Sequence, residues 1–305
     1  MREKFTNNHK PYFILLFAWW LLLQSAGLFY YFSDGFPSRI PAEQLVAQDN
    51  LERDSWVWDL NSNCLDRYPF PAANDFPWWF CYLEKERGAT VGLVGSSLMN
   101  QMIPGLIEAE ELDAQNFLSI GTCPLLMDPK VARSFPEPNP CDIEPREAQF
   151  AFLEQEFLSH PLSVILIESG GDPSPIRMEQ LRKVVQYAKT VVVVAPWKIP
   201  PFAPRDCLLR PVSLGKKSDC AVDESHWAEQ SDTWERFKVS VGVEFPEVLF
   251  FDPNRSFCSG GTCKFLNSGQ PIMRDIIHIS SFGSRLVAED FVIWSNESLP
   301  SLTSE

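Results

Sequence analysis

The sequence predicts a three-layer α/β/α domain, built on a mostly parallel five-stranded sheet and preceded by a single N-terminal transmembrane helix. Two observations favour this fold class. Short, continuously apolar segments alternate with helical segments from residue 89 onward, and a charge-free apolar stretch lies near the N-terminus. Strands that are apolar on both faces are typical of a parallel sheet that helices cover on both sides. A chain of 305 residues is long enough to bury such a sheet.

The membrane helix is predicted at residues 12–32, which are 21 residues without a charge. About 20 apolar residues are enough for a helix to cross the hydrocarbon core. Because three basic residues precede this stretch, the positive-inside rule places residues 1–11 in the cytoplasm as a tail and the rest of the chain outside. A cleaved signal peptide that ends at Ala26 is the alternative. The continuation of the apolar stretch to residue 32 favours an uncleaved anchor.

The composition is that of an acidic globular protein. Hydrophobic residues make up 45% of the chain, charged residues 22%, and the net charge is −14. A nucleic-acid partner is not expected, because phosphate binding needs a concentrated basic face.

All eight cysteines follow the predicted anchor, and an even number in an exported domain predicts disulfides. Eight cysteines permit 105 pairings, which the sequence cannot separate. Proximity along the chain suggests four bonds: Cys64–Cys81, Cys123–Cys141, Cys207–Cys220 and Cys258–Cys263. A zinc site is the alternative, but the chain has no CxxC or HxxxH spacing and four histidines, so we expect no metal and no cofactor.

The chain divides into further segments. Residues 33–55 are polar and proline-containing and are predicted to form a linker, and residues 298–305 to form a tail. Residues 56–87 contain two cysteines and a dense set of aromatic residues: Trp56, Trp58, Trp78, Trp79, Phe80 and Tyr82. This segment is interpreted as a cap packed on the main domain at residues 88–297. The alternative is a stacking platform for sugar rings.

Strands and helices alternate through the main domain. Apolar periods predict strands at 89–95, 116–121, 162–170, 190–196 and 247–252. Helical periods predict a helix after residue 96 that bends near Pro104 and Gly105, and further helices at 144–160, 176–189, 226–242 and 280–296. Ligands of such folds gather at the carboxyl ends of the strands.

The first candidate catalytic residue is Ser97, which follows the strand predicted at 89–95 and begins a helix. A serine in such a turn projects its hydroxyl over the edge of the sheet, near backbone N–H groups that can stabilise an oxyanion. The alternative is a structural role, since serine is also a common helix N-cap.

The second candidate is the pair Asp275 and His278, just before the last helix. A histidine can act as a general base, and a carboxylate three residues earlier can hold its other ring nitrogen. The alternative is an unrelated aspartate and histidine in a surface loop. A nucleophile after the first strand and a base before the last helix would meet at one edge of the sheet, which favours the catalytic interpretation.

These motifs resemble the SGNH or GDSL-type hydrolases, and most closely the extracytoplasmic SGNH domain of membrane acyltransferases that O-acetylate surface polysaccharides. The resemblance covers about residues 88–295. It is carried by VGLVGSSLMNQM (91–102), LSIGTCPLL (118–126), VVVVAPWKIPPFAPRDC (191–207) and the Cys-loop and Asp-x-x-His segment at 251–290. It implies a flavodoxin-like sheet, with Ser97 as nucleophile, His278 as base and Asp275 as the residue that orients the base.

The resemblance also implies an oxyanion hole made by the backbone N–H groups of Ser97, Gly121 and Gly170. Two departures stand out. The family's Gly-Asp-Ser is Gly95-Ser96-Ser97 here, and the loop after the third strand contains no asparagine donor. Loss of one oxyanion donor typically costs about 10²–10³ in rate.

Four further residues are expected to contact substrate: Ser96, Glu168, Asp172 and Trp197. For the two carboxylates, which lie at the edge of the third predicted strand, the alternative is a solvated position in a loop.

Three functions remain open at this stage. The first is acetyl transfer through a Ser97 acyl-enzyme to a glycan hydroxyl, with a multispanning membrane acyltransferase as the partner that supplies acetyl groups. The second is an esterase that uses the same triad with water as acceptor. The third is an inactive protein that binds a glycan or a partner through the aromatic segment. The resemblance implies location in the cell inner membrane, with the main domain periplasmic or extracellular.

Overall fold

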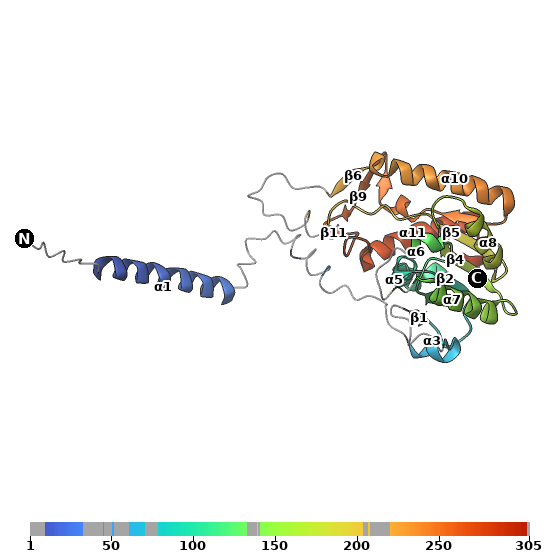
Figure 1. The fold of residues 1–305 in the computed structure, drawn as a ribbon, viewed down its shortest axis with the longest axis horizontal. Helices are drawn as coiled ribbons and strands as arrows, with labels where there is room; N and C mark the ends of the chain where they lie inside the picture. Colours follow the sequence, from blue (N-terminus) through green and yellow to red (C-terminus); the bar gives the residue numbers. More distant parts are fainter. Residues whose placement is uncertain are drawn as a thin grey trace, which may run out of the picture.

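The computed structural model describes residues 10–32, 45, 51, 61–70, 79–132, 139, 141–203, 207 and 220–303 (Figure 1). The predicted tail at 1–11, the linker at 33–55 and Trp56, Trp58 and Trp78 fall wholly or mostly outside these residues.

Helix α1, Lys10–Phe32, contains the predicted membrane span. The stretch Tyr12–Phe32 has a mean hydropathy of 1.8, and none of it is buried against the described parts of the chain. By length and composition, this helix can cross a membrane.

The centre of the α/β domain is one six-stranded sheet in the order β1-β3-β2-β4-β5-β7. Its strands are β1 Phe80–Leu83, β2 Val91–Val94, β3 Phe117–Gly121, β4 Leu162–Glu168, β5 Ala188–Val194 and β7 Leu249–Phe251. The last five pair in parallel and correspond to the five predicted strands. The prediction of five strands was wrong by one, because β1 adds an antiparallel sixth strand beside β3.

Helices cover both faces of the sheet, which confirms the three layers. The helices that pack on the sheet are α4 Ser97–Asn100, α5 Ile103–Glu108, α7 Ile143–Phe157, α8 Pro175–Val184, α10 Ala228–Glu244 and α11 Ser281–Ser298. One hydrophobic cluster joins alternate sheet residues to α7, α8 and α10, and the other joins the remaining sheet residues to α4, α5 and α11. Alternation along each strand supplies both cores.

Shorter elements complete the described chain. They are α3 Ser62–Arg67, η3 Glu110–Leu112, α6 Pro129–Ala132, β6 Ala221–Asp223, η5 Glu224–Trp227, η6 Pro253–Ser256, β8 Cys258–Ser259, β9 Thr262–Lys264, β10 Leu266–Asn267, β11 Gln270–Pro271 and α12 Pro300–Thr303.

The bend expected near Pro104 and Gly105 is a break between α4 and α5, with the proline in the first turn of α5. Helix α5 then packs closely on α11, since a Cβ on Gly105 would lie 2.2 Å from the backbone oxygen of Ser284. The Ser284 hydroxyl accepts from Gly105 N at 2.9 Å and donates to the Met102 carbonyl at 3.1 Å.

All four disulfides form between the pairs suggested by proximity along the chain. The Cys64–Cys81 bond fixes α3 against β1. In the same segment Trp79 is only 4% exposed and stacks on Phe70, with 4.1 Å between ring centroids. Trp79 therefore packs into the domain, as the cap interpretation predicts, and offers no free face to a sugar ring.

Candidate active site

The turn between β2 and α4 places Ser97 at the start of the helix. Ser96 is the N-cap, and its Oγ accepts from Leu98 N at 3.1 Å. The sequence leaves open whether the serine of this turn caps the helix or acts in catalysis. In the structure Ser96 is the cap, and Ser97 is the first residue of the helix. Gly95 precedes them where a Cβ would lie 2.9 Å from both Glu168 Oε1 and Met99 Cγ, so a larger residue would displace the turn.

Ser97 and His278 meet although 181 residues separate them. Ser97 Oγ lies 2.9 Å from His278 Nε2. On the other side of the ring, His278 Nδ1 lies 2.8 Å from Asp275 Oδ2 and 3.0 Å from Oδ1. These are the contacts that a serine nucleophile, a base and an orienting carboxylate require.

The loop that carries the histidine is held by its own carboxylate and by the serine's helix. Asp275 Oδ1 accepts from the backbone N–H groups of Ile277 and His278, each at 2.9 Å. Gln101, the C-cap residue of α4, accepts through Oε1 from Ile279 N at 2.9 Å. This contact ties the backbone next to the base directly to the helix that begins with the nucleophile. Sequence reasoning missed Gln101: it lies within the matching stretch 91–102, but nothing in that stretch distinguishes its side chain from its neighbours.

Electrostatics around the imidazole favour its neutral form. Burial lowers the pKa of His278, and the positive charge of Arg274 acts in the same direction. The hydrogen bond and charge of Asp275 oppose this shift without cancelling it. For Asp275, burial raises the pKa, but hydrogen bonds from Ile277 and His278, together with the histidine charge, leave it below its usual value. A neutral imidazole facing a carboxylate can accept a proton from Ser97 at Nε2.

Gly121 packs against the nucleophile turn. Its φ is +130°, and a Cβ there would lie 2.8 Å from the backbone oxygen of Gly95. The loop after it is fixed at Leu126, whose carbonyl accepts from Arg177 Nε at 3.0 Å, and by the Cys123–Cys141 disulfide. Gly170 packs on this same loop, since a Cβ on it would lie 1.9 Å from the Leu126 oxygen. The structure thus places Gly121 beside the turn and Gly170 against Leu126.

Glu168 does not occupy the solvated or substrate-facing position that its sequence suggests. It is the last residue of β4 and only 7% exposed. Its Oε1 accepts from Ser96 N at 2.8 Å and from Ser96 Oγ at 2.6 Å. These bonds engage both side chains with each other. The buried Glu168 does not fit the predicted contact with substrate, whereas Ser96 is half-buried and its contact with substrate stays a prediction.

The other two residues predicted to contact substrate, Trp197 and Asp172, differ in their exposure. Trp197 is 6% exposed and packs in the core on the α11 side of the sheet, which contradicts a role as a substrate platform. Asp172 is exposed and pairs with Arg236 at 2.7 Å. It remains accessible to a ligand.

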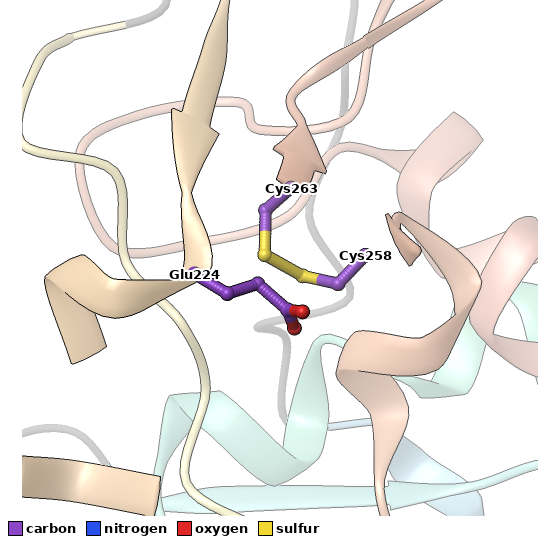
Figure 2. Close-up of side chains that lie close together, drawn as sticks. All are labelled: Glu224, Cys258 and Cys263. Carbon is purple, nitrogen blue, oxygen red and sulfur yellow. A yellow bond between two sulfur atoms is a disulfide. The ribbon is translucent and has the colours of Figure 1, made fainter. Parts of the chain in front are cut away.

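A second group of side chains of the types that bind metals is formed by Glu224, Cys258 and Cys263. Figure 2 shows the Glu224 carboxylate beside the disulfide between Cys258 and Cys263. Zinc binds cysteine as thiolate, and these two sulfurs are bonded to each other. Glu224 also forms an ion pair with Lys198 at 2.6 Å. The disulfide therefore closes a structural hairpin, and the ion pair of Glu224 joins this region to the loop after β5.

Comparisons with known proteins bear on the fold and the family of the chain. No curated protein matches the chain in sequence. Among solved structures, the periplasmic domain of a Salmonella ser. Paratyphi A lipopolysaccharide acetyltransferase matches with a TM-score of 0.50 and 12% identity, over 68% of this chain and 84% of that one. At this identity the match shows the fold alone. The family model of the SGNH domain, described as fused to AT3 domains, matches residues 63–292. Because this match covers more than half of the chain, the protein belongs to the SGNH-domain family.

Proposed function

We propose that the protein is a membrane-anchored serine O-acyltransferase that moves acetyl groups onto glycan hydroxyls outside the cytoplasm. The observation that carries the proposal is the Ser97 Oγ–His278 Nε2 contact of 2.9 Å, with Asp275 on the opposite ring nitrogen. Membership of the SGNH family supports acyl transfer or ester hydrolysis as the reaction class. An inactive protein would have no need to keep the Ser97 hydroxyl beside the Asp275–His278 pair across a separation of 181 residues.

The first half-reaction makes an acyl-enzyme. His278 Nε2 takes the proton from Ser97 Oγ, and the oxygen attacks the acetyl carbonyl of the donor. Asp275 holds Nδ1–H and stabilises the imidazolium. Backbone N–H groups of Ser97 and Gly121, with Gly170 as a third candidate, would face the oxyanion. When the intermediate collapses, the donor's leaving group departs with the proton from His278, and the acetyl group stays on Ser97.

The second half-reaction repeats these steps with an acceptor. His278 takes a proton from a glycan hydroxyl, the alkoxide attacks the acyl-enzyme, and the proton returns to Ser97 as the ester product leaves. Water in place of the glycan would make the enzyme an esterase.

The anchor and the family description support the setting of this reaction. We place α1 in the cell inner membrane with residues 1–11 in the cytoplasm, because three basic residues precede the span. Four disulfides fit a main domain in an oxidising compartment. The AT3 domains of the family description support a multispanning acyltransferase as the partner that supplies acetyl groups.

The partition between transfer and hydrolysis tests the proposal. The full-length chain in detergent is given a chromogenic acetyl ester, with and without a soluble oligosaccharide acceptor, and both acetate and acetylated oligosaccharide are measured. Transfer predicts that acceptor diverts acetyl groups from water, and that Ser97→Ala and His278→Ala abolish both products. Hydrolysis alone at saturating acceptor would make the enzyme an esterase. Turnover that survives Ser97→Ala would contradict both versions.

A further inference from the structure

Glu168 is a buried carboxyl group to which the proposed reaction gives no task. Burying a carboxyl group is costly unless it is hydrogen-bonded, so its position needs a reason. The group does not face open solvent: Oε1 lies 2.8 Å from Ser96 N and 2.6 Å from Ser96 Oγ. Both bonds end on the residue immediately before the proposed nucleophile.

The contact continues into the helix that Ser97 begins. Ser96 Oγ donates to Glu168 and accepts from Leu98 N at 3.1 Å, so the carboxyl group is linked to the first turn of α4 through one hydroxyl. The Ser96 backbone N–H binds the same oxygen, which fixes the main chain as well as the side chain. Gly95 makes this approach possible, because any Cβ there would lie 2.9 Å from Oε1.

The sheet supplies a rigid base for these bonds. β2 and β4 are hydrogen-bonded neighbours, with Val94 opposite Ile167. Glu168 is the next residue of β4, and the turn 95–96 is the direct continuation of β2. A group on a packed strand holds its neighbour more accurately than one on a loop.

We propose that Glu168 is a positioning residue that, through Ser96, holds Ser97 Oγ at bonding distance from His278 Nε2. The inference rests on the proposed function, because it gives Ser97 a catalytic role. Burial raises the pKa of Glu168 to about 7, against the effect of hydrogen bonds from Ser96 and Met99. Oε1 can accept both Ser96 bonds whether the group is ionised or protonated, so positioning depends on the acceptor and not on the charge.

The test compares variants that keep or remove the acceptor. In the full-length protein, kcat and KM for a chromogenic acetyl ester are measured together with thermal unfolding. Glu168→Leu and Ser96→Ala are expected to lower kcat by about tenfold to a hundredfold with little change in KM, since a displaced nucleophile binds substrate but reacts slowly. Glu168→Gln keeps Oε1 as acceptor and is expected to stay within about threefold of wild type. Glu154→Gln, at an exposed position of α7, is the matched control and is expected to change nothing.

A second pair of variants reverses the donor and the acceptor of the hydrogen bond between residues 96 and 168. It keeps the test valid if Glu168→Leu does not fold. Ser96→Asp places a second carboxylate against Glu168, and well above pH 7, where Glu168 is ionised, the repulsion is expected to lower kcat. Combining Ser96→Asp with Glu168→Gln restores a hydrogen bond in the reverse direction, from the new amide to the new carboxylate, and is expected to recover part of the loss in kcat. The inference is overturned if the folded Glu168→Leu or Ser96→Ala enzyme has wild-type kcat, or if the double variant is no better than Ser96→Asp. Wild-type protein without Ser97-dependent turnover would instead remove the proposed function, and this inference with it.

Discussion

At the scale of single residues, the state of the imidazole sets the pH dependence of the reaction. His278 must be neutral to accept a proton from Ser97, and burial, together with the Arg274 charge, lowers the pKa of the imidazole below its ordinary value of 6.5. We therefore expect kcat/KM to decrease in acid with a midpoint below pH 6.5, and to have its full value at neutral pH. A pH–rate profile with a soluble acetyl ester checks this. An acid limb centred above 6.5 would contradict a buried neutral base.

The protonation of Glu168 should make the free energy of unfolding depend on pH. Whereas kcat/KM rises with pH, this contribution to stability falls as the pH rises. Its pKa is raised in the folded state from 4.5 to about 7, so the native protein binds more protons than the unfolded chain between these values. The free energy of unfolding therefore decreases as the pH rises through this window. Glu168→Gln cannot ionise, and the difference in unfolding free energy between wild type and variant should shift in favour of the variant from pH 5 to pH 8.

Denaturant titrations at both pH values measure this difference. His278 has a lowered pKa and the reverse effect on stability, but it is present in both proteins. Its contribution therefore cancels in the difference between wild type and Glu168→Gln. The exposed Glu154→Gln change serves as control. A wild-type-minus-Gln difference that stays constant with pH would contradict the buried, proton-binding carboxyl group.

At the scale of elements, the contact between α5 and α11 holds the two parts of the site together. α5 follows the short helix of Ser97, and α11 follows the loop of His278. A methyl group at Gly105 would meet the backbone of Ser284 at 2.2 Å, which cannot move as a side chain would. Gly105→Ala is expected to destabilise the protein by about 1–3 kcal/mol and to reduce turnover.

Gly242 in α10 is a matched control for that substitution. A Cβ there meets nothing within 4 Å, so Gly242→Ala should leave activity unchanged and add about 0.5–1 kcal/mol of stability through helix propensity. Equal effects of the two alanines on denaturant midpoints would show that close packing at Gly105 does not matter.

Sequence periodicity predicted the core elements well, and its errors have local causes. The helix predicted at 176–189 ends at Val184, because Ala188 and Lys189 join β5, where Ala188 pairs with Leu162 of β4. Strand β1 was missed, since its four residues lie in a cysteine-bearing aromatic segment that reads as a cap. Edge pairing to β3 determines its conformation, and no local pattern reveals a partner 37 residues away in register, such as Ser119 for Tyr82.

The same limit applies to the site. Ser97, Asp275 and His278 follow from motifs, and the structure brings them together as the motifs predict. The positions of Glu168 and Gln101 depend on which side chains face each other between neighbouring strands or between a helix and a loop. Spacing along the chain carries no such information, so the sequence predicts a substrate contact or a solvated position for Glu168 and not its bond to Ser96.

At the scale of the whole molecule, the anchor and the disulfides make one joint prediction about compartment. If α1 spans the membrane with its basic flank inside, all eight cysteines lie in an oxidising space and are paired. Whole cells treated with a maleimide polymer after denaturation should show no modified protein unless a reductant is added first. Modification without reductant would place the domain in a reducing compartment and contradict the topology.

The most direct test of the central claim is covalent labelling of the nucleophile. A fluorophosphonate reacts with a serine only where a base activates it. The full-length protein is expected to carry one label on the peptide that contains Ser97, and both Ser97→Ala and His278→Ala should lose it while their thermal unfolding stays near that of wild type. A folded wild-type protein that takes no label, or a label that persists in Ser97→Ala, would contradict an active triad.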